Sequence, residues 1–128
     1  MIVGVGIELV DTARFEATLA RFGMRFRERL FTTDERAFST SVHSTRTARG
    51  AQSLAARFAA KLATRRALNA PSLPWRDIEV VRVGHGAPTL LLRGAAQQVA
   101  RSAGVDSIAL TLTHDSQWSI GQVILESS

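Results

Sequence analysis

Residues 54–68 read LAARFAAKLATRRAL, and this stretch carries the strongest helix signal in the chain. Its residues are good helix formers, and neither Gly nor Pro interrupts them. Leu54, Phe58 and Leu62 recur every four residues, which gives the expected helix one apolar face that can pack. The stretch therefore predicts a long helix on which the rest of the fold is organised.

A second row on the same helix is basic. Arg57, Lys61 and Arg65 follow one another at i, i+4, a spacing at which like charges repel by roughly 0.2–0.5 kcal/mol per pair. The row itself contains no Asp or Glu that would offset this repulsion. Two interpretations stay open: a solvated face of an ordinary amphipathic helix, or a face that binds an anion.

The composition narrows the class of protein. With 128 residues, 45% of them hydrophobic, the chain suits one domain over 1–128 with its own core. No apolar run approaches the ~18–20 residues of a membrane span, and the start does not read as a secretory signal. Cys is absent, which excludes disulfides and thiolate metal sites and agrees with a cytoplasmic location.

The charge balance indicates an acidic partner. The net charge is +5, and Lys61 is the one lysine beside fifteen arginines. An Arg stays protonated near neutral pH, whereas a Lys in a suitable site can lose its proton, so Lys61 is a candidate for chemistry. The chain has no Tyr and no basic patch interleaved with aromatic residues, so we expect no nucleic-acid partner, and we expect no membrane partner either.

The first strand is expected over residues 2–10, as a buried strand. Its alternation puts Gly4, Gly6 and Glu8 on one side and large apolar residues on the other, namely Val3, Val5, Ile7 and Leu9. Two glycines on one face allow another backbone or a ligand to come close. Glu8 is the carboxylate on that glycine face.

Further elements follow from caps, breakers and alternation. Asp11 caps a helix that ends at Gly23, and a basic segment continues to Phe31. The remaining expectations are a short helix over 34–38, a long loop over 39–53, a connector over 69–75, strands over 78–83 and 89–92, a helix over 94–103, and strands over 107–113 and 117–125. This order predicts an α+β domain in which an antiparallel sheet is covered on one side by the long helix, with an exposed sheet edge.

Four collinear stretches resemble one known family. They are residues 4–10 (GVGIELV), 56–67 (ARFAAKLATRRA), 84–88 (GHGAP) and 112–115 (LTHD). In that order they are similar to G-I-D-[IVL]-V, R-F-A-A-K-E-A-x-x-K-A, G-x-G-[KR]-P and S-x-[ST]-H of the holo-acyl-carrier-protein synthases, which are small 4′-phosphopantetheinyl transferases. The resemblance implies the phosphopantetheinyl transferase fold, transfer of the 4′-phosphopantetheine arm of coenzyme A to a serine of an acyl carrier protein, Mg²⁺ as cofactor, and a homotrimer with sites between subunits.

The catalytic positions of the family are altered in this chain. The family holds its metal with an Asp, which matches Glu8, and a Glu, which matches Leu62 and cannot ligate a metal. The family's catalytic Lys matches Arg66. The resemblance therefore makes Glu8, Lys61 and Arg66 the candidate catalytic residues, Glu8 the candidate metal ligand, and Leu62 part of an altered pocket, and it puts Mg²⁺ in doubt.

The binding positions are retained. By the same resemblance, coenzyme A would be held by cationic side chains and one histidine, namely Arg46, Arg49, Arg57, Lys61 and His114. Arg14, Arg21 and Arg25 would form the surface for an acidic carrier protein.

Three functions fit this pattern. The first is a phosphopantetheinyl transferase with an altered metal site. The second is a repurposed relative without transferase activity that acts on a carrier-bound acyl or polyketide chain, for example in a cyclisation. The third is a module that only binds a carrier protein. A fold alone does not choose among them.

Overall fold

The computed structural model describes residues 1–42, 48–82 and 86–128, without the side chains of 38–42 and 48–53. In chain order the elements are β1 (Ile2–Asp11), α1 (Thr12–Leu30), α2 (Thr33–Val42), α3 (Ala48–Ala67), the short 3₁₀ helix η1 (Trp75–Asp77), β2 (Ile78–Val81), β3 (Thr89–Leu92), α4 (Gly94–Ser102), β4 (Ser107–His114) and β5 (Trp118–Glu126). The α+β class and the long helix expected from residues 54–68 are confirmed.

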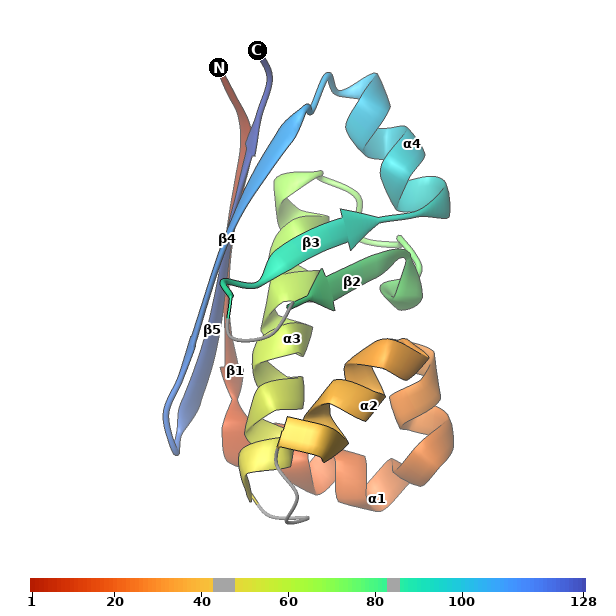
Figure 1. The fold of residues 1–128 in the computed structure, drawn as a ribbon, viewed down its shortest axis with the longest axis vertical. Helices are drawn as coiled ribbons and strands as arrows, with labels where there is room; N and C mark the ends of the chain where they lie inside the picture. The colour runs from red at the N-terminus through yellow and green to blue at the C-terminus, as the bar shows by residue number, and fades with distance from the viewer. Residues whose placement is uncertain (43–47, 83–85) are drawn as a thin grey trace.

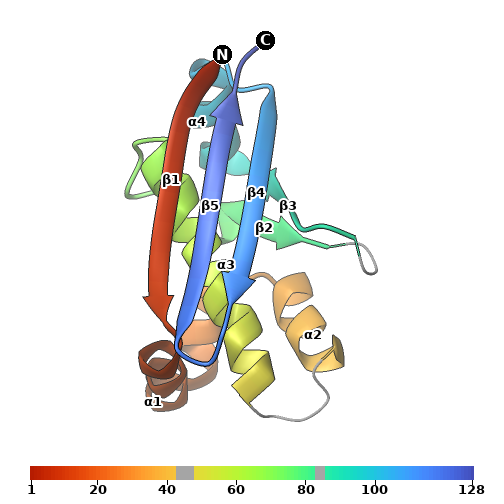
Figure 2. The same cartoon turned by 90° about the vertical axis from the view of Figure 1, so that its left-hand side faces the viewer.

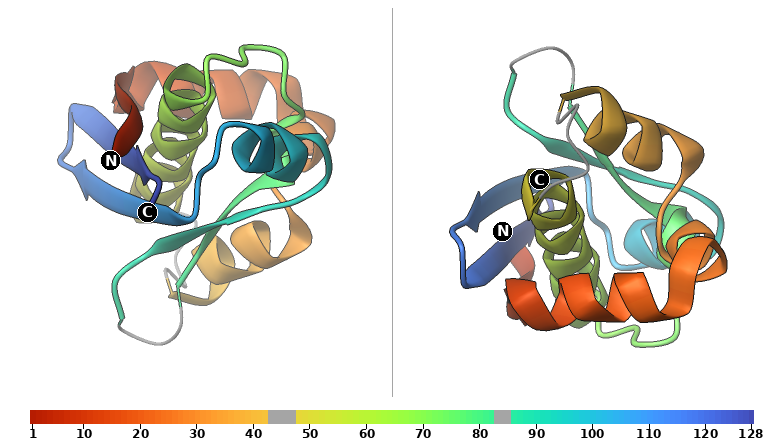
Figure 3. Two further views of the ribbon diagram at one scale, coloured as in Figure 1. Left: turned by 90° about the horizontal axis from the view of Figure 1, so that it is seen from above. Right: turned by 90° about the horizontal axis from the view of Figure 1, so that it is seen from below.

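The elements form layers on either side of α3 (Figures 1 and 2). Strands pair antiparallel in the order β1-β5-β4, and α3 lies against one face of this sheet. The hairpin of β2 and β3 and the helices α1, α2 and α4 lie on the other side of α3, as the end-on views show (Figure 3). Helix α3 is therefore the centre of the molecule.

Glycines set the distance between α3 and the sheet. Gly4 and Gly6 of β1 face α3, and a Cβ on either would collide with a carbonyl oxygen of that helix, Ala67 or Ala63 respectively. In β5, a Cβ on Gly121 would lie 2.6 Å from the amide nitrogen of Ala60. The expectation that the glycine face of β1 admits a close backbone is confirmed, and the backbone is that of α3.

The other face of β1 corrects the expectation of a buried strand. Its large apolar side chains are exposed, with exposed fractions from 38% to 55%: Val3, Val5, Ile7 and Leu9. The reason is geometric. Alternation along the strand sends the glycines toward α3, so the large side chains point to the outer face of the sheet, which no other element of the described chain covers (Figure 2).

The start of α1 agrees with the expected cap, whereas the end of α2 and the start of α3 differ from the sequence-based expectation. Asp11 caps α1 by accepting a hydrogen bond from the backbone N–H of Arg14 at 3.1 Å, and Gly23, at φ 73°, breaks the helix into two parts, as expected. The expected loop over 39–53 is wrong at both ends, because α2 continues to Val42 and α3 already begins at Ala48.

Aromatic and aliphatic residues of the described chain form three hydrophobic clusters, two of which include residues of α3. Phe15 stacks on Phe58 with ring centroids 5.1 Å apart, and Phe58 also packs against Trp75. Under the sheet, Ala63 packs with Val123 and Leu125. In the part of the chain that the structure describes, no helix has the length and apolar character needed to cross a bilayer.

Candidate functional site

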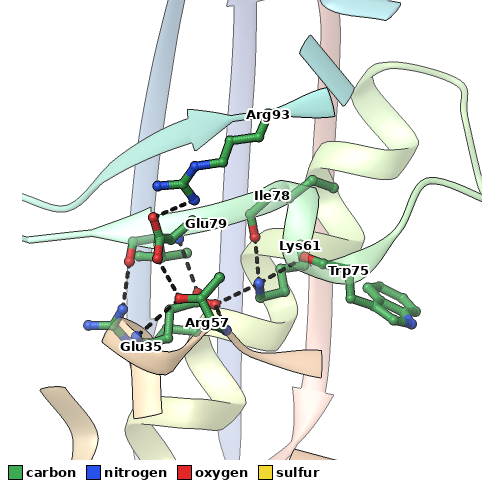
Figure 4. Close-up of polar contacts among 9 residues, drawn as sticks. Glu35, Arg57, Lys61, Trp75, Ile78, Glu79 and Arg93 are labelled. Atoms are coloured by element: carbon green, nitrogen blue, oxygen red, sulfur yellow. Dashed lines mark hydrogen bonds and ion pairs between the residues drawn. The ribbon is translucent and has the colours of Figure 1, made fainter. Parts of the chain in front are cut away.

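The polar side chains of α3 fall on two separate faces of the helix. Arg57 and Lys61 point away from the sheet, toward α2 and β2 (Figure 4). Glu8 of β1 and Arg66 of α3 meet on another side, at the edge of the sheet. The structure therefore places Arg57 and Lys61 in a buried network and Glu8 and Arg66 at a surface hollow.

Lys61 lies at the centre of the buried network. Its side chain is fully buried, and its ammonium donates to Glu35 Oε1 at 2.8 Å, to the Trp75 carbonyl at 3.0 Å and to the Ile78 carbonyl (Figure 4). Burial lowers the pKa of Lys61 from its ordinary value, and the charge and hydrogen bond of Glu35 oppose that effect. All three N–H donors of the ammonium are satisfied inside the protein.

Arg57 is buried beside Lys61. Its Nη1 donates to the carbonyl oxygen of Val80 at 2.7 Å, and burial lowers the pKa of its guanidinium, an effect that the nearby Glu35 carboxylate opposes. Neither Arg57 nor Lys61 faces solvent, and neither lines the surface hollow, so their contact with the phosphates of coenzyme A stays a prediction. The charges of Arg57 and Lys61 are offset from within the protein by a carboxylate of α2, which neither interpretation of the basic row included.

Two glutamates that the sequence reasoning missed complete this network. Glu35 accepts hydrogen bonds from the backbone N–H groups of Thr32 and Val80 at 3.0 and 3.1 Å, in addition to Lys61. Glu79 accepts from the Thr32 hydroxyl and from Arg93 Nη1, the latter at 2.8 Å. A charged residue within the apolar run of β2 was the available signal for Glu79.

The pKa of Glu79 reflects these contacts. Burial would raise the pKa of its carboxyl, but the hydrogen bonds from Thr32 and Arg93 and the charge of Arg93 outweigh burial and hold it below its ordinary value. The polar groups of the network are therefore paired with one another inside the protein, which is typical of a structural cluster.

The second face of α3 borders a hollow of about 310 Å³. It is lined by side chains from β1, α3 and the segment after it: Glu8, Leu62, Arg65, Arg66, Asn69 and Pro71. Glu8 and Arg66 form an ion pair across it, in which Arg66 Nε donates to Glu8 Oε1. The Glu8 side chain is 21% exposed and that of Arg66 is 64% exposed. The three expected positions Glu8, Leu62 and Arg66 are thus brought together.

Arg65 gives the hollow a second cation. Its guanidinium carbon lies 3.2 Å from the centre of the Trp75 ring, and Nη2 donates to the carbonyl oxygen of Leu73. Burial lowers the pKa of Arg65 from its usual high value. With two guanidinium groups and one carboxylate, the lining carries a net positive charge and suits an anion.

The same lining does not fit a magnesium ion. Mg²⁺ requires oxygen ligands in near-octahedral geometry. Glu8 is the one carboxylate of the hollow, and it is already paired with Arg66. Among the described residues, no three of His, Cys, Asp and Glu lie close enough to share a metal ion. A metal held at this position would also face two guanidinium groups.

The remaining expected residues lie elsewhere. His114 ends β4, exposed and paired across the strands with Ser119, and β5 separates it from Glu8 on β1. One chain therefore does not bring His114 to the hollow. Arg46 lies outside the described residues, and Arg49 is on α3 with its side chain outside the description.

The three arginines expected to meet a carrier protein are all exposed on α1. Arg14 lies in its first part, and Arg21 and Arg25 lie on either side of the Gly23 break. Two exposed apolar side chains, Phe22 and Met24, lie between the latter two in the sequence. We call these five residues the α1 surface.

Comparison with known proteins adds the following. Residues 4–121 match the family model of the 4′-phosphopantetheinyl transferase superfamily. A holo-[acyl-carrier-protein] synthase of Beutenbergia cavernae is 48% identical over 116 residues, which are 90% of each chain. Another, of Solibacter usitatus, is 38% identical and covers 99% of this chain and 100% of the relative.

The structural comparison agrees. The crystal structure of a holo-(acyl-carrier-protein) synthase from Bacillus anthracis in complex with CoA (3′,5′-ADP) matches with a TM-score of 0.80 and 30% identity. The match covers 100% of this chain and 99% of that one. The resemblance seen in the sequence motifs therefore extends over the whole fold.

Proposed function

This chain belongs to the 4′-phosphopantetheinyl transferase superfamily, and from that premise we propose that it transfers the 4′-phosphopantetheine arm of coenzyme A to a serine of an acyl carrier protein. The observation that supports this proposal is the cationic hollow beside α3, where Arg66 offers a guanidinium group to a phosphate and Arg65 adds a second positive charge. The related B. anthracis protein was crystallised with coenzyme A, a ligand that presents such phosphates.

The reaction balances without a redox partner. The serine hydroxyl oxygen forms a bond to the phosphorus on the pantetheine side of the pyrophosphate, and the bond from that phosphorus to the bridging oxygen breaks. The leaving 3′,5′-ADP takes the electron pair, and the serine proton passes to water. Positioning and charge neutralisation are the main tasks of a protein in such a transfer, and Glu8, Arg65 and Arg66 are the residues we assign to them.

We also propose that the chain acts as a homotrimer. The outer face of the sheet exposes a row of large apolar side chains on β1, and a second copy of the chain would remove this row from water. A neighbouring copy would also supply the His114 that one chain leaves on the opposite edge strand from Glu8. A site between subunits explains why a single chain shows only part of it.

The α1 surface is our candidate for the carrier-protein contact. Its three arginines would attract an acidic partner, and Phe22 and Met24, each 57% exposed, would provide apolar contacts. None of these side chains lines the hollow. The two surfaces can therefore serve different partners at the same time.

Mass spectrometry tests the transfer directly. The protein is incubated with coenzyme A and an apo carrier protein, with and without Mg²⁺, and the carrier is examined for the added phosphopantetheine mass. We expect that mass to appear, and we expect a Ser→Ala carrier to stay unmodified. If the carrier stays unmodified although the protein binds coenzyme A, a repurposed relative becomes the better description.

One observation favours that second candidate. By the resemblance, Leu62 stands where the family motif has a Glu that would bind the metal, so this chain offers one carboxylate there, Glu8. A non-transferring relative acting on a carrier-bound acyl chain would need an apolar cavity. The hollow beside Leu62 instead has two guanidinium groups and an amide in its lining, which supports a phosphate-bearing ligand and leaves transfer as our first proposal.

A further inference from the structure

We infer that the Arg66 guanidinium, oriented by Glu8, neutralises the pyrophosphate of coenzyme A in this chain, so that coenzyme A binds without a divalent cation. The inference rests on the proposed function, because it names how the same hollow would hold the same substrate. It departs from the metal-dependent chemistry that the resemblance implies, and it starts from the poor fit of the lining to Mg²⁺.

The geometry leaves Arg66 able to bind a ligand. Its Nε is used by Glu8, and within the described residues neither Nη group has a hydrogen-bond partner. The side chain is 64% exposed and lies at the rim of the hollow. Pairing with Glu8 restricts the side chain on one edge, while the opposite edge presents the N–H donors that fit two phosphate oxygens at once.

The substitution at position 62 supports this role for Arg66. The two residues are four apart on α3, so a carboxylate at position 62 would pair with the Arg66 guanidinium and compete with a phosphate for it. Leu62 cannot do so. A carboxylate there would also repel a phosphate unless a metal ion lay between them. Leu62 therefore leaves the Arg66 guanidinium without a competing carboxylate at that position, as a site that binds phosphate through Arg66 requires.

No other cation of α3 with a described side chain can take this role. The ammonium of Lys61 is buried with all its donors satisfied, and Arg57 donates to Val80 beneath the surface. Arg65 lines the hollow, but its guanidinium stacks on Trp75 and donates to Leu73. Arg65 would add positive charge, whereas Arg66 is the group that makes direct hydrogen bonds to the phosphates.

Isothermal titration calorimetry with coenzyme A and with 3′,5′-ADP tests the inference. The whole protein is dialysed against EDTA and titrated, and the titration is repeated with excess Mg²⁺. We compare the unaltered chain with Arg66→Gln and with the control Arg101→Gln, which removes one exposed cation from α4. A Leu62→Glu/Arg66→Lys variant restores the residue types that the family motif has at both positions. Thermal unfolding checks that each variant is folded.

We expect the unaltered chain to bind coenzyme A with a Kd that changes by less than about 2-fold between EDTA and Mg²⁺. Loss of a charged hydrogen-bond donor should weaken binding roughly 10-fold or more in Arg66→Gln, and Arg101→Gln should change it by less than about 2-fold. The double variant should bind weakly in EDTA and regain affinity with Mg²⁺.

The outcomes separate the two proposals. Binding by the unaltered chain only in the presence of Mg²⁺ overturns the guanidinium site and leaves the proposed function intact. If the unaltered chain binds coenzyme A in EDTA while Arg66→Gln weakens this binding no more than Arg101→Gln does, that result overturns the role of Arg66. If neither coenzyme A nor 3′,5′-ADP binds in either buffer, the proposed function fails, and the inference fails with it.

Discussion

Removal of the Lys61 ammonium would leave Glu35 and the carbonyl groups of Trp75 and Ile78 without their shared donor inside the protein. We expect Lys61→Met to lower the free energy of unfolding by about 3–5 kcal/mol, because it leaves the buried Glu35 carboxylate without the cation that donates a hydrogen bond to it. Urea denaturation followed by circular dichroism measures the change.

A double-mutant cycle provides the control for this prediction. In Glu35→Gln/Lys61→Met the buried charge is removed together with its partner, so the double variant should lose less stability than the two single variants combined. Additive losses would show that the two side chains do not interact in solution as they do in the structure.

Glu79 links stability to pH at the same network. Because its folded-state pKa lies below the ordinary value of about 4.5, the unfolded chain binds more protons in that range. The contribution of Glu79 is therefore complete above about pH 4.5 and declines as the pH falls through the lower, folded-state pKa. We expect Glu79→Gln to reduce the slope of unfolding free energy against pH in this acidic window, measured by urea denaturation at a series of pH values.

Glu16→Gln is the matched control, since Glu16 is exposed on α1. It should leave that slope nearly unchanged. Equal slopes for Glu79→Gln and the unaltered chain would contradict the role given to the contacts with Thr32 and Arg93.

Single residues also show which features of the candidate site could be predicted from the sequence and which could not. The motif alignment placed Glu8, Leu62 and Arg66 at one site, and the structure brings them together. It did not foresee that Lys61 is buried, because its carboxylate partner Glu35 is 26 residues away in the sequence. The residue spacing along a helix shows only which side chains are neighbours on that helix. The charge on Lys61 of α3 is offset by Glu35, which belongs to α2.

At the level of elements, the close contact of β1 with α3 requires that positions 4 and 6 carry no side chain, as in Gly4 and Gly6. A methyl group at position 6 would meet the carbonyl oxygen of Ala63, so α3 would have to move away from the sheet. We expect Gly6→Ala to lower the unfolding free energy by about 1–3 kcal/mol. Ala17→Ser, which also adds one heavy atom but at an exposed position of α1, should change it far less.

Thermal unfolding monitored by circular dichroism gives the comparison. An unchanged melting temperature in Gly6→Ala would mean that the helix and the strand are not as close in solution as in the structure. The glycine pattern was readable from sequence, because a strand with two glycines on one face indicates a close neighbour.

The polar segment between α2 and α3 was the least predictable part. Residues 39–53 lack the apolar periodicity of a packed helix, and Ser and Thr have modest helix propensity, so a loop was the natural expectation. In the structure both helices extend into this region, and α2 and α3 contact each other. Both helices therefore extend beyond what local propensity predicts, because propensity takes no account of helix continuation from the residues on either side.

For the whole molecule, the exposed outer face of the sheet leads us to expect that copies of the chain associate through β1. Ile7 is 50% exposed on the outer face of β1. We expect the unaltered chain to elute as a trimer and Ile7→Glu as a monomer in size-exclusion chromatography with light scattering, because burial of a charge between copies is costly.

Phe22→Glu offers a matched control. Phe22 has a similar exposed fraction of 57% but lies on α1, so this variant should remain a trimer. A trimer in both variants would show that the outer face of β1 is not the interface. Alternation along β1 separated the two faces of the strand but did not show that the face with the large apolar side chains is left uncovered, because that depends on the other elements of the fold.

The burial of Lys61 has one more consequence for experiments on this protein. Because it is the one lysine in the chain, the folded molecule presents no accessible ε-amino group. Acylating reagents such as succinimidyl esters should therefore label this position only when the layers around α3 separate. The rate of that labelling, followed by peptide mass mapping, would report transient opening of the folded protein without any engineered probe.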